Sequence, residues 1–340
     1  MVRRKLVAQR AGVSEATVSR VLNGVDGVKE GTRKKVLEAV EALGYRPNAI
    51  AQSFVKGRSG NIGVIVPHIP QVHLFSTHYF GEISSGIAVG LSKYRLHMLL
   101  LFYQSDDPDQ VLHAFESRKI DGCIVLGANE KTRGIESLKA AGCPVCFVSH
   151  RDEDPLTSYV DTDNVNGAYL ATSHLIKSGH ERIAFLNGPL MYTNSVDRLE
   201  GFQKALADAG MHFDPALVLQ GNYSRTSGYA AVAHFLAINP IPTSVFVAND
   251  RMAAGFILGL REVGLRVGQH VSLVGYDDAD IATITDPPLT TIRVPFFEMG
   301  KRAASILVEK IGRGESSQGE KIRLPAELIV RESSQSVRQL

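Results

Sequence analysis

From residue 61 onward the sequence alternates between short apolar runs and stretches with helical periodicity, and this alternation limits the fold more than any other feature. Strands buried on both faces are near-continuous Val/Ile/Leu runs. The first set of expected strands is Ile62–Val66, Met98–Tyr103, Gly122–Leu126 and Val145–Ser149. The second set is Arg182–Asn187, Ser244–Ala248, Ser272–Tyr276 and Thr290–Val294. Repeated strand–helix units predict an α/β fold with two lobes, each a parallel sheet covered by helices.

Helices are expected between these strands. Those of the first lobe lie near Phe80–Tyr94, Pro108–Arg118 and Thr132–Ala141. Those of the second lobe lie near Val165–Ser178, Val196–Gly210, Ser227–Ile238, Arg251–Val263 and Phe296–Ile311. The chain is expected to cross between the lobes near Tyr159–Asp163 and Pro287–Pro295. A length of 340 residues suits two or three domains.

A different pattern precedes residue 45. In the run AQRAGVSEATVSRVLNG at residues 8–24, Gly12 and Val13 predict a tight turn, and Ser14 is placed to cap a second helix. A third helix is expected at Thr32–Leu43. Two short helices joined by a Gly-containing turn are typical of a DNA-reading helix-turn-helix, although a helical hairpin from an unrelated bundle has the same spacing. The expected inward residues are Leu6, Val7, Ala11, Ala16 or Thr17, Val18, Val21, Leu22, Val36, Val40 and Leu43.

Charge is distributed unevenly along the chain. The formal net charge is only +2, but residues 1–60 contain twelve Lys/Arg and five Asp/Glu. A basic head on a mildly acidic body indicates nucleic-acid binding by the head, while a solvated basic tail would give the same count. The basic residues fall among helical periodicities, which favours the first interpretation.

Several other classes of protein lack support in the sequence. No run of about 18 uncharged apolar residues is present, and no apolar segment follows the basic N-terminus. Cys143 and Cys146 have C-x-x-C spacing but accompany an apolar strand, and the histidines His68, His73 and His78 lack a Cys or carboxylate at ligand spacing. We find no nucleotide-binding or hydrolase motif. We therefore expect a cytoplasmic protein that is not an enzyme, with no cofactor, no bound metal and no membrane contact.

Three segments carry a family resemblance. GVSEATVSRVLNG at 12–24, TRKKVLEAVEALGYRPNAIAQSF at 32–54 and IGVIVP at 62–67 are similar to segments of the LacI/GalR (lactose-repressor) family. The likeness continues over nearly the whole chain.

The resemblance implies three parts. These are a helix-turn-helix DNA-binding head at 1–46, a hinge helix and linker at 47–60, and a two-lobed, periplasmic-binding-protein-like core for effector binding and dimerisation at 61–340. It further implies a sequence-specific transcription regulator, a repressor, that binds a palindromic double-stranded operator as a homodimer. A regulator of this architecture could respond to a sugar as effector, or to a nucleobase, nucleoside or phosphoprotein. A solute-binding protein or an enzyme with an incidental basic head is the remaining alternative.

The second helix supplies the candidates for reading DNA bases. Arg20 could bind guanine with both arms of its guanidinium, Glu15 could accept a hydrogen bond from cytosine N4, and Ala16 could contact a thymine methyl. Glu15 could instead be solvated or favour the helix N-terminus by its charge. The residues expected to contact phosphates are Ser14, Thr17, Ser19 and Asn23.

The resemblance also assigns a hinge helix at 48–56, with Ala51 and Phe54 at the minor groove. Phe54 replaces the family's wedging Leu and could unstack a base step, or it could pack on the core. At the start of the first helix, Arg3 and Arg4 stand where the family has a Thr cap and a buried Ile. This predicts a weakly capped first helix, or a start of the protein further upstream.

Polar residues follow several strands, where ligands of open α/β sheets bind. The resemblance implies that Arg198, Asn249 and Asp277 contact an effector, and Asp161 lies in the matching crossover strand. Carboxylates and a guanidinium suit a sugar, because sugar hydroxyls both donate and accept hydrogen bonds. The neighbouring residue Asp250 is expected to cap a helix, and Asp278 to be solvated.

Aromatic residues are also expected at the cleft. Phe75 or Tyr79 could stack on a sugar face or simply pack in the core, and Phe296 is a third candidate. Val294 occupies a position that is polar in the family. Its lack of a hydrogen-bonding group argues against recognition of a lactose-like ligand.

Overall fold

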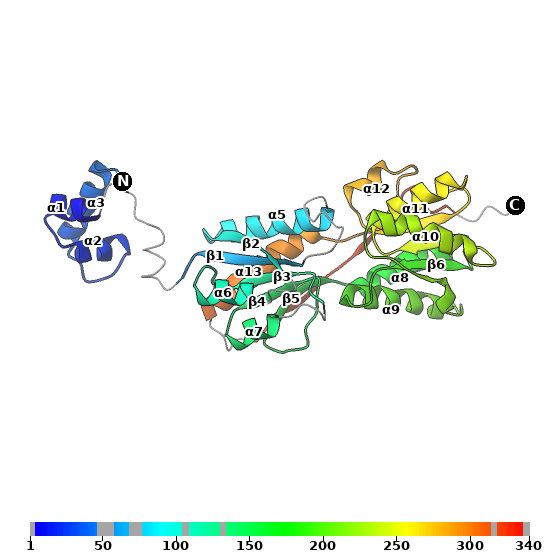
Figure 1. Cartoon of the computed structure of the whole chain (residues 1–340), viewed down its shortest axis with the longest axis horizontal. Helices are drawn as coiled ribbons and strands as arrows, with labels where there is room; N and C mark the ends of the chain where they lie inside the picture. The colour runs from blue at the N-terminus through cyan, green and yellow to red at the C-terminus, as the bar shows by residue number, and fades with distance from the viewer. Residues whose placement is uncertain are drawn as a thin grey trace.

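The computed structural model describes residues 4–45, 58–67, 77–103, 109–129, 134–313 and 318–335. Within these ranges the chain forms a helical head followed by two α/β lobes (Figure 1). The first lobe, here the N lobe, contains β1 to β5, α13 and β11. The second, here the C lobe, contains the elements from α8 to β10 and β12.

The head consists of α1 (Arg4–Ala11), α2 (Glu15–Leu22) and α3 (Glu30–Ala42). Gly12 has φ +66°, and this left-handed turn lets the Val13 amide donate to the Ala8 carbonyl at 3.0 Å. Ser14 then caps α2, because its hydroxyl accepts from the Thr17 amide at 3.1 Å. The predicted helix–turn–helix geometry is therefore present, and local sequence chemistry explains it.

The three helices enclose a small apolar core of their own. One expected member is wrong: Leu6 is 49% exposed. Successive helical residues are turned by about 100°, and the buried face of α1 runs through Val7, Ala8 and Ala11, so Leu6 points away from it. The fully buried residues of the head core are Val7, Ala8, Ala11, Val18, Val21, Val36 and Ala39.

The N lobe is a sheet of six parallel strands in the order β11-β5-β4-β3-β1-β2. Its strands are β1 (Asn61–Pro67), β2 (His97–Tyr103), β3 (Cys123–Leu126), β4 (Val145–Val148), β5 (Ser158–Thr162) and β11 (Lys321–Leu324). Its helices are α5 (His78–Ser92), α6 (Gln110–Glu116), α7 (Ile135–Ala140) and α13 (Phe296–Arg313). The central strands β3 and β4 are buried along their whole length, as their apolar runs predict.

The C lobe repeats this plan in the order β12-β10-β9-β8-β6-β7, with β12 antiparallel to β10. Its strands are β6 (Ile183–Asn187), β7 (Val218–Gln220), β8 (Ser244–Val247), β9 (Ser272–Asp277), β10 (Thr290–Arg293) and β12 (Glu327–Ile329). Its helices are α8 (Asn164–Lys177), α9 (Thr193–Asp208), the 3₁₀ turn Pro215–Leu217, α10 (Arg225–Ala237), α11 (Asp250–Glu262) and α12 (Asp280–Ile284). The fold class expected from the sequence is confirmed.

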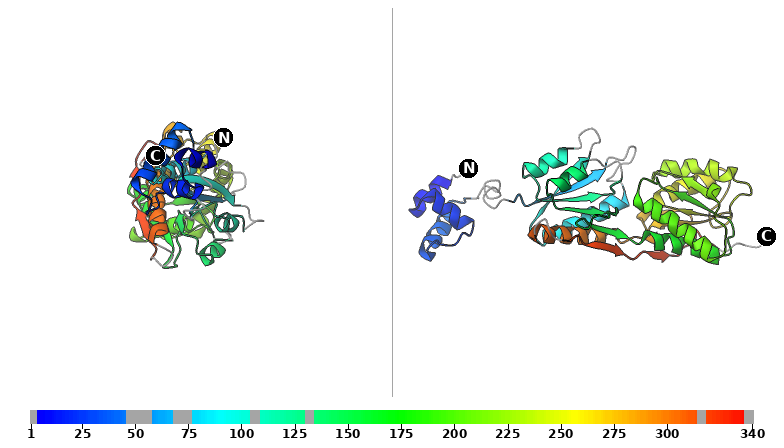
Figure 2. Two further views of the ribbon diagram at one scale, coloured as in Figure 1. Left: turned by 90° about the vertical axis from the view of Figure 1, so that its left-hand side faces the viewer. Right: turned by 90° about the horizontal axis from the view of Figure 1, so that it is seen from below.

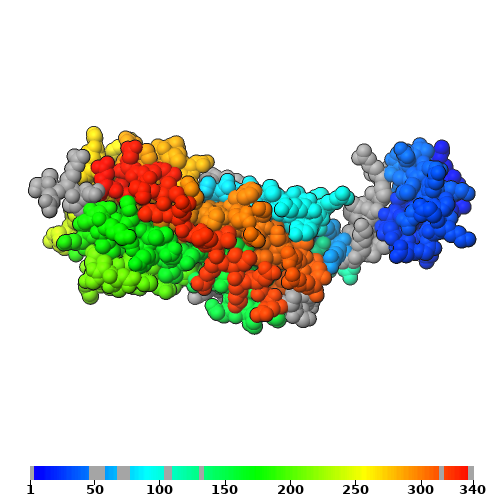
Figure 3. All heavy atoms as spheres, turned by 180° about the vertical axis from the view of Figure 1, so that it is seen from behind, coloured from blue at the N-terminus to red at the C-terminus, as the bar shows by residue number. Residues whose placement is uncertain are grey.

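Three segments join the lobes. The first two, from β5 into α8 and from β10 into α13, match the two expected crossings. The third, from β11 into β12, was not expected, and Figures 2 and 3 show this C-terminal segment (red) lying along both lobes. It escaped prediction because both strands are short and partly exposed.

Helices α5 and α13 pack so closely that they act as one layer. A Cβ atom on Gly86 would lie 2.0 Å from the Phe297 carbonyl oxygen, and one on Gly300 would lie 2.2 Å from the Ile83 carbonyl oxygen. Only glycine allows this backbone approach. Since α13 begins at the lobe junction, a shift there would be transmitted to the rest of the N lobe.

Candidate functional site

The N-terminal part of α2 faces solvent. Glu15, Ala16 and Arg20 are exposed, as is the capping residue Ser14. Arg20 forms no ion pair within the part of the chain that the structure describes, whereas Glu15 lies 3.3 Å from the Arg4 guanidinium. Arg4, which departs from the family pattern, thus ties the start of α1 to the start of α2.

The side chains that are expected to contact phosphates already form hydrogen bonds with one another. Ser14 and Thr17 share a hydroxyl contact of 2.9 Å, and the Asn23 amide donates to the Ser19 hydroxyl at 3.3 Å. Thr17, Ser19 and Asn23 are half-buried. The polar groups of α2 therefore order the helix even without DNA.

The hinge residues Ala51 and Phe54 lie outside the described residues, but the root of the linker is described. The Asp121 carboxylate accepts the amides of Ser59 at 2.6 Å and Gly60 at 2.8 Å. Arg58 donates to the Ile311 carbonyl, near the end of α13, at 3.0 Å. The base of the linker is thus fastened to the start of β3 and to α13.

A cleft of about 610 Å³ opens between the two lobes. Six of the seven expected effector residues line it: Tyr79, Asp161, Arg198, Asn249, Asp277 and Phe296. The seventh, Phe75, lies outside the described residues. The structure brings the six together at the carboxyl ends of the strands, which is the position that the strand–loop pattern predicts.

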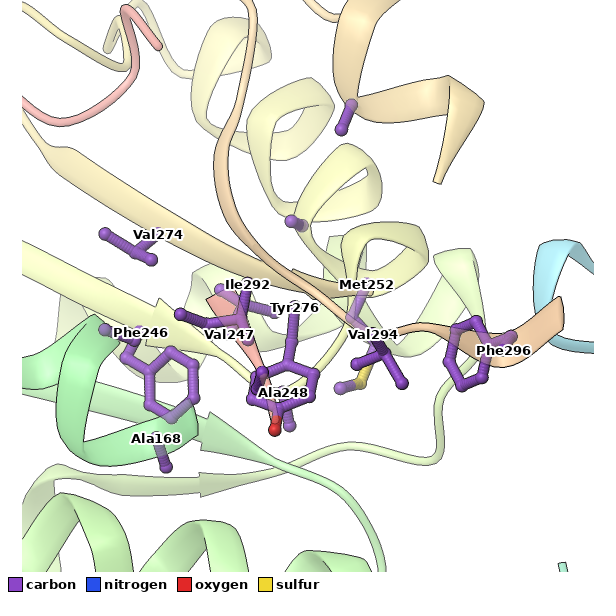
Figure 4. Close-up of a cluster of buried hydrophobic side chains, with 14 of the residues drawn as sticks. Ala168, Phe246, Val247, Ala248, Met252, Val274, Tyr276, Ile292, Val294 and Phe296 are labelled. Carbon is purple, nitrogen blue, oxygen red and sulfur yellow. The ribbon is translucent and has the colours of Figure 1, made fainter. Parts of the chain in front are cut away.

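Arg198 lies at the centre of this group and is buried. Its Nε donates to the Asn164 side-chain oxygen at 3.0 Å, and its Nη1 donates to the Ala248 carbonyl at 2.5 Å. The guanidinium stacks on the Tyr276 ring at 3.8 Å from the ring centre. Figure 4 shows Tyr276 beside Ala248 in a cluster of buried apolar side chains. Arg198 is therefore held in one orientation before any ligand arrives.

Two carboxyl groups accompany Arg198. Asp161 accepts the Thr162 amide and the Asn164 amide group through Oδ1, while Oδ2 is buried without a partner. Burial raises the pKa of Asp161 to about 6 and that of Asp277 to about 7, the latter against the opposing charge of Arg198. A buried carboxylate oxygen without a hydrogen bond is costly, and a ligand hydroxyl would satisfy it.

Two neighbouring acidic residues have other roles than expected. Asn249, not Asp250, caps α11 by accepting the Met252 amide at 2.9 Å. Asp250 is fully buried and reaches across the sheet to the Ala279 amide and the Thr291 hydroxyl. Asp278 is not solvated, because it pairs with Arg293 and Arg331 at 2.7 and 2.6 Å. These contacts fix the loop after β9, and with it Asp277.

Aromatic rings enclose the cleft from both lobes. Tyr79 and Phe296 meet edge to face with ring centres 5.3 Å apart, and Phe296 is 4% exposed. Tyr192 and Tyr223 also line the cleft, with ring centres 6.1 Å apart. Val294 lies in the apolar cluster next to Phe296 (Figure 4).

An ion pair joins the lobes beside the cleft. Arg151, which follows β4 in the N lobe, binds the carboxylate of Asp197 in α9 of the C lobe with both arms of its guanidinium. Asp197 is 1% exposed and precedes Arg198 directly. Arg151, Tyr192, Tyr223 and Asn164 were not predicted from the sequence, since they lie in loops or at helix starts without a distinctive motif. Arg151 and Asn164 follow β4 and β5 within three residues, and that position was the available signal.

A helix-turn-helix head followed by two lobes around a polar cleft defines a ligand-responsive transcription regulator. The family described as bacterial regulatory proteins, lacI family, matches residues 5–48, and a periplasmic binding protein-like domain matches residues 172–334. The HTH-type transcriptional regulator CelR of Thermobifida fusca is 36% identical over 332 residues, which cover 97% of each chain. The protein belongs to the LacI family and is a DNA-binding transcription regulator.

Solved structures agree with this assignment. The lac repressor dimer bound to operator and the anti-inducer ONPF has a TM-score of 0.82 at 29% identity, covering 98% of this chain and 99% of that one. The CelR–cellobiose complex has a TM-score of 0.77 at 33% identity, covering 98% and 100%. None of the helices in the described ranges is long and apolar enough to cross a membrane.

Proposed function

We propose that the protein is a cytoplasmic, homodimeric repressor without enzymatic activity, and that a sugar in the interlobe cleft controls its affinity for a palindromic operator. The observation that carries this proposal is the buried Arg198 between lobes, accompanied by Asp161 and Asp277. The buried Oδ2 of Asp161 has no hydrogen-bond partner among the described residues, and a sugar hydroxyl could donate a hydrogen bond to it. The CelR relative is described in complex with cellobiose, a disaccharide.

For DNA, we propose that Arg20 reads guanine and Ala16 contacts a thymine methyl. Both side chains are exposed on α2, and Arg20 has no ion pair among the described residues that would have to break before it binds. Glu15 is the weaker base reader, because its contact with Arg4 favours a role at the helix N-terminus. Ser14, Thr17, Ser19 and Asn23 would contact phosphates, and Ala51 and Phe54 would enter the minor groove.

A second copy of the chain would cover an exposed apolar face. β2 is an edge strand among the described strands of its sheet, and such an edge normally needs cover. The helices α5, α10, α11 and α12 lie on one side of the two lobes in Figure 1. Apolar side chains that are 36–80% exposed on these elements are Val89, Met98, Leu99, Phe102, Tyr229, Leu258 and Ile284. Two-fold pairing through this face would give two equal heads for two equal half-sites.

Coupling from cleft to head would run through α13. This helix begins at Phe296 in the cleft and extends to Arg313, and the Ile311 carbonyl receives Arg58 at the root of the linker. Because α13 is locked to α5, a ligand that changes the lobe arrangement moves the linker root as well. A coupling free energy of about 1–3 kcal/mol would change operator affinity roughly 5–150-fold.

A thermal-unfolding panel tests the sugar assignment. Full-length protein is unfolded with glucose, cellobiose, hypoxanthine, guanine and adenosine, each at a millimolar concentration or at its solubility limit. We expect a rise in the unfolding midpoint with a sugar and none with the purines. A rise only with the purines would replace the sugar by a nucleobase or nucleoside as effector.

A further inference from the structure

Two arginines lie at the C-lobe side of the cleft. Arg225 is the first residue of α10 and Arg251 is the second residue of α11, and both line the cleft. Arg225 is exposed, and neither arginine forms an ion pair within the described ranges. By contrast, Arg151 beside the cleft is paired with Asp197, and Arg331 is paired with Asp278. An arginine that is left unpaired inside a cleft is available to a ligand.

The two guanidinium groups lie close enough to influence each other. α10 and α11 pack side by side in the C lobe (Figure 1). Burial, and then the charge of Arg225, lower the pKa of Arg251. Arg251 is half-buried, and its Nη1 is enclosed without a hydrogen-bond acceptor. An arginine stays charged in a protein, so the repulsion and the missing acceptor persist until an anion arrives.

The surroundings of the pair favour an anion further. Both arginines stand in the first turn of a 13-residue helix, where the helix dipole is positive. Thr226 lines the same part of the cleft and offers a hydroxyl. The acidic lining residue Asp280 is exposed at the start of α12 and pairs with neither arginine within the described ranges.

We propose that Arg225 and Arg251 form an oxyanion subsite, and that the effector carries a phosphate or carboxylate group in addition to its hydroxyls. The planar guanidinium fork matches both groups, since each presents adjacent oxygens. Asp161 and Asp277 would accept hydrogen bonds from the ligand hydroxyls, while Arg225 and Arg251 would bind the charged end of the ligand. A sugar phosphate and a sugar acid share this chemistry. The inference rests on the proposed function, because it takes the interlobe cleft as the effector site.

The first test uses inorganic phosphate and does not depend on the sugar. Thermal unfolding of the full-length protein is followed by tyrosine fluorescence, which reports the core because nine of the ten tyrosines lie beyond residue 60. Sodium phosphate is compared with sodium chloride at equal ionic strength. The variants are Arg225→Gln/Arg251→Gln and the control Arg261→Gln, an exposed arginine at the other end of α11.

We expect phosphate to raise the unfolding midpoint of the wild type and the control by about 2 °C or more. The double variant should lose most of that rise. An equal rise in all three proteins, or no rise in the wild type, would overturn the oxyanion subsite.

The second test uses matched ligands in isothermal titration calorimetry. The pairs are glucose with glucose 6-phosphate, glucose with glucuronate, and cellobiose with cellobionate. We expect at least one anionic member to bind the wild type about tenfold more tightly than its neutral partner. In Arg225→Gln/Arg251→Gln this preference should disappear, while affinity for the neutral partner stays within about twofold.

The two proposals fail in different ways. In the first case cellobiose or glucose binds, but the two arginines raise neither the affinity for the anionic sugars nor the stabilisation by phosphate. The subsite is then wrong and the sugar effector stands. If phosphate stabilises the protein through the two arginines but no sugar binds, the subsite stands and the sugar effector is wrong.

Discussion

Replacing Asp277 should make the free protein more stable. Asp277 ends β9 at φ +116°, a backbone conformation unfavourable for residues other than glycine. Burial raises the pKa of its carboxyl from 3.8 to about 7. A shift of that size means that ionising the carboxyl costs about 4 kcal/mol more in the folded protein than in the unfolded chain. We expect about half of this difference to appear in the free energy of unfolding, because Asp250 and Arg198 share the interaction.

The sign of the pH dependence follows from the raised pKa. The folded protein holds the Asp277 proton more tightly than the unfolded chain, so this residue stabilises the fold below about pH 4, and that stabilisation is lost as the pH rises through 7. Asp277→Asn is neutral at every pH. It should raise the free energy of unfolding by about 2 kcal/mol at pH 8 and by about 0.8 kcal/mol at pH 5.

Asp277→Gly separates charge from backbone strain. Glycine relieves the unfavourable φ as well, which should add about 1 kcal/mol at both pH values. Urea unfolding of the full-length variants, followed by tyrosine fluorescence at pH 5 and pH 8, measures these differences. The control is Asp280→Asn, an exposed carboxylate three residues away, which should change little. An Asn variant that is less stable than the wild type at pH 8, or equally stabilised at both pH values, would refute the reasoning.

Three further predictions concern DNA binding, the lobe contact and the dimer. Arg20→Ala should lower affinity for a specific operator by about 1–3 kcal/mol in fluorescence anisotropy; an equal loss on random DNA would refute base reading. Arg151→Met leaves the buried Asp197 carboxylate unpaired, so its unfolding midpoint should fall, and adding Asp197→Asn should restore part of the loss; no recovery would argue against the ion pair as cause. Met98→Glu places a charge on the exposed edge strand and should shift sedimentation equilibrium toward monomer; an unchanged dimer would exclude this face.

Much of the fold could be predicted because its signals are local. Gly12 and Ser14 define the turn and the cap of α2 within five residues of sequence. The buried strands are apolar along their length, as β3 and β4 show. The third crossing could not be predicted, because β11 and β12 are only four and three residues long, are partly exposed, and gain their place by pairing with strands far away in the sequence.

The cleft was predictable only in part. Asp161 and Asp277 stand at strand ends, where position alone marks them. Asn249 and Asp250 are adjacent and both polar, so the sequence could not tell which one caps α11 and which one crosses the sheet. The contact of Arg151 with Asp197 joins the loop after β4 to helix α9, 46 residues further along the chain, and no periodic pattern in the sequence predicts such a pair.

The central claim is that one small molecule in the cleft changes the affinity of the head for one DNA sequence. It is tested most directly by selecting genomic fragments that bind the full-length protein, then titrating the recovered operator in fluorescence anisotropy with glucose, cellobiose and glucose 6-phosphate. We predict sequence-selective, salt-dependent binding whose affinity changes with at least one of these sugars. In Asp277→Ala the operator should still bind, and the response to sugar should be gone. Binding without sequence selectivity, or a sugar response that survives in Asp277→Ala, would contradict the account.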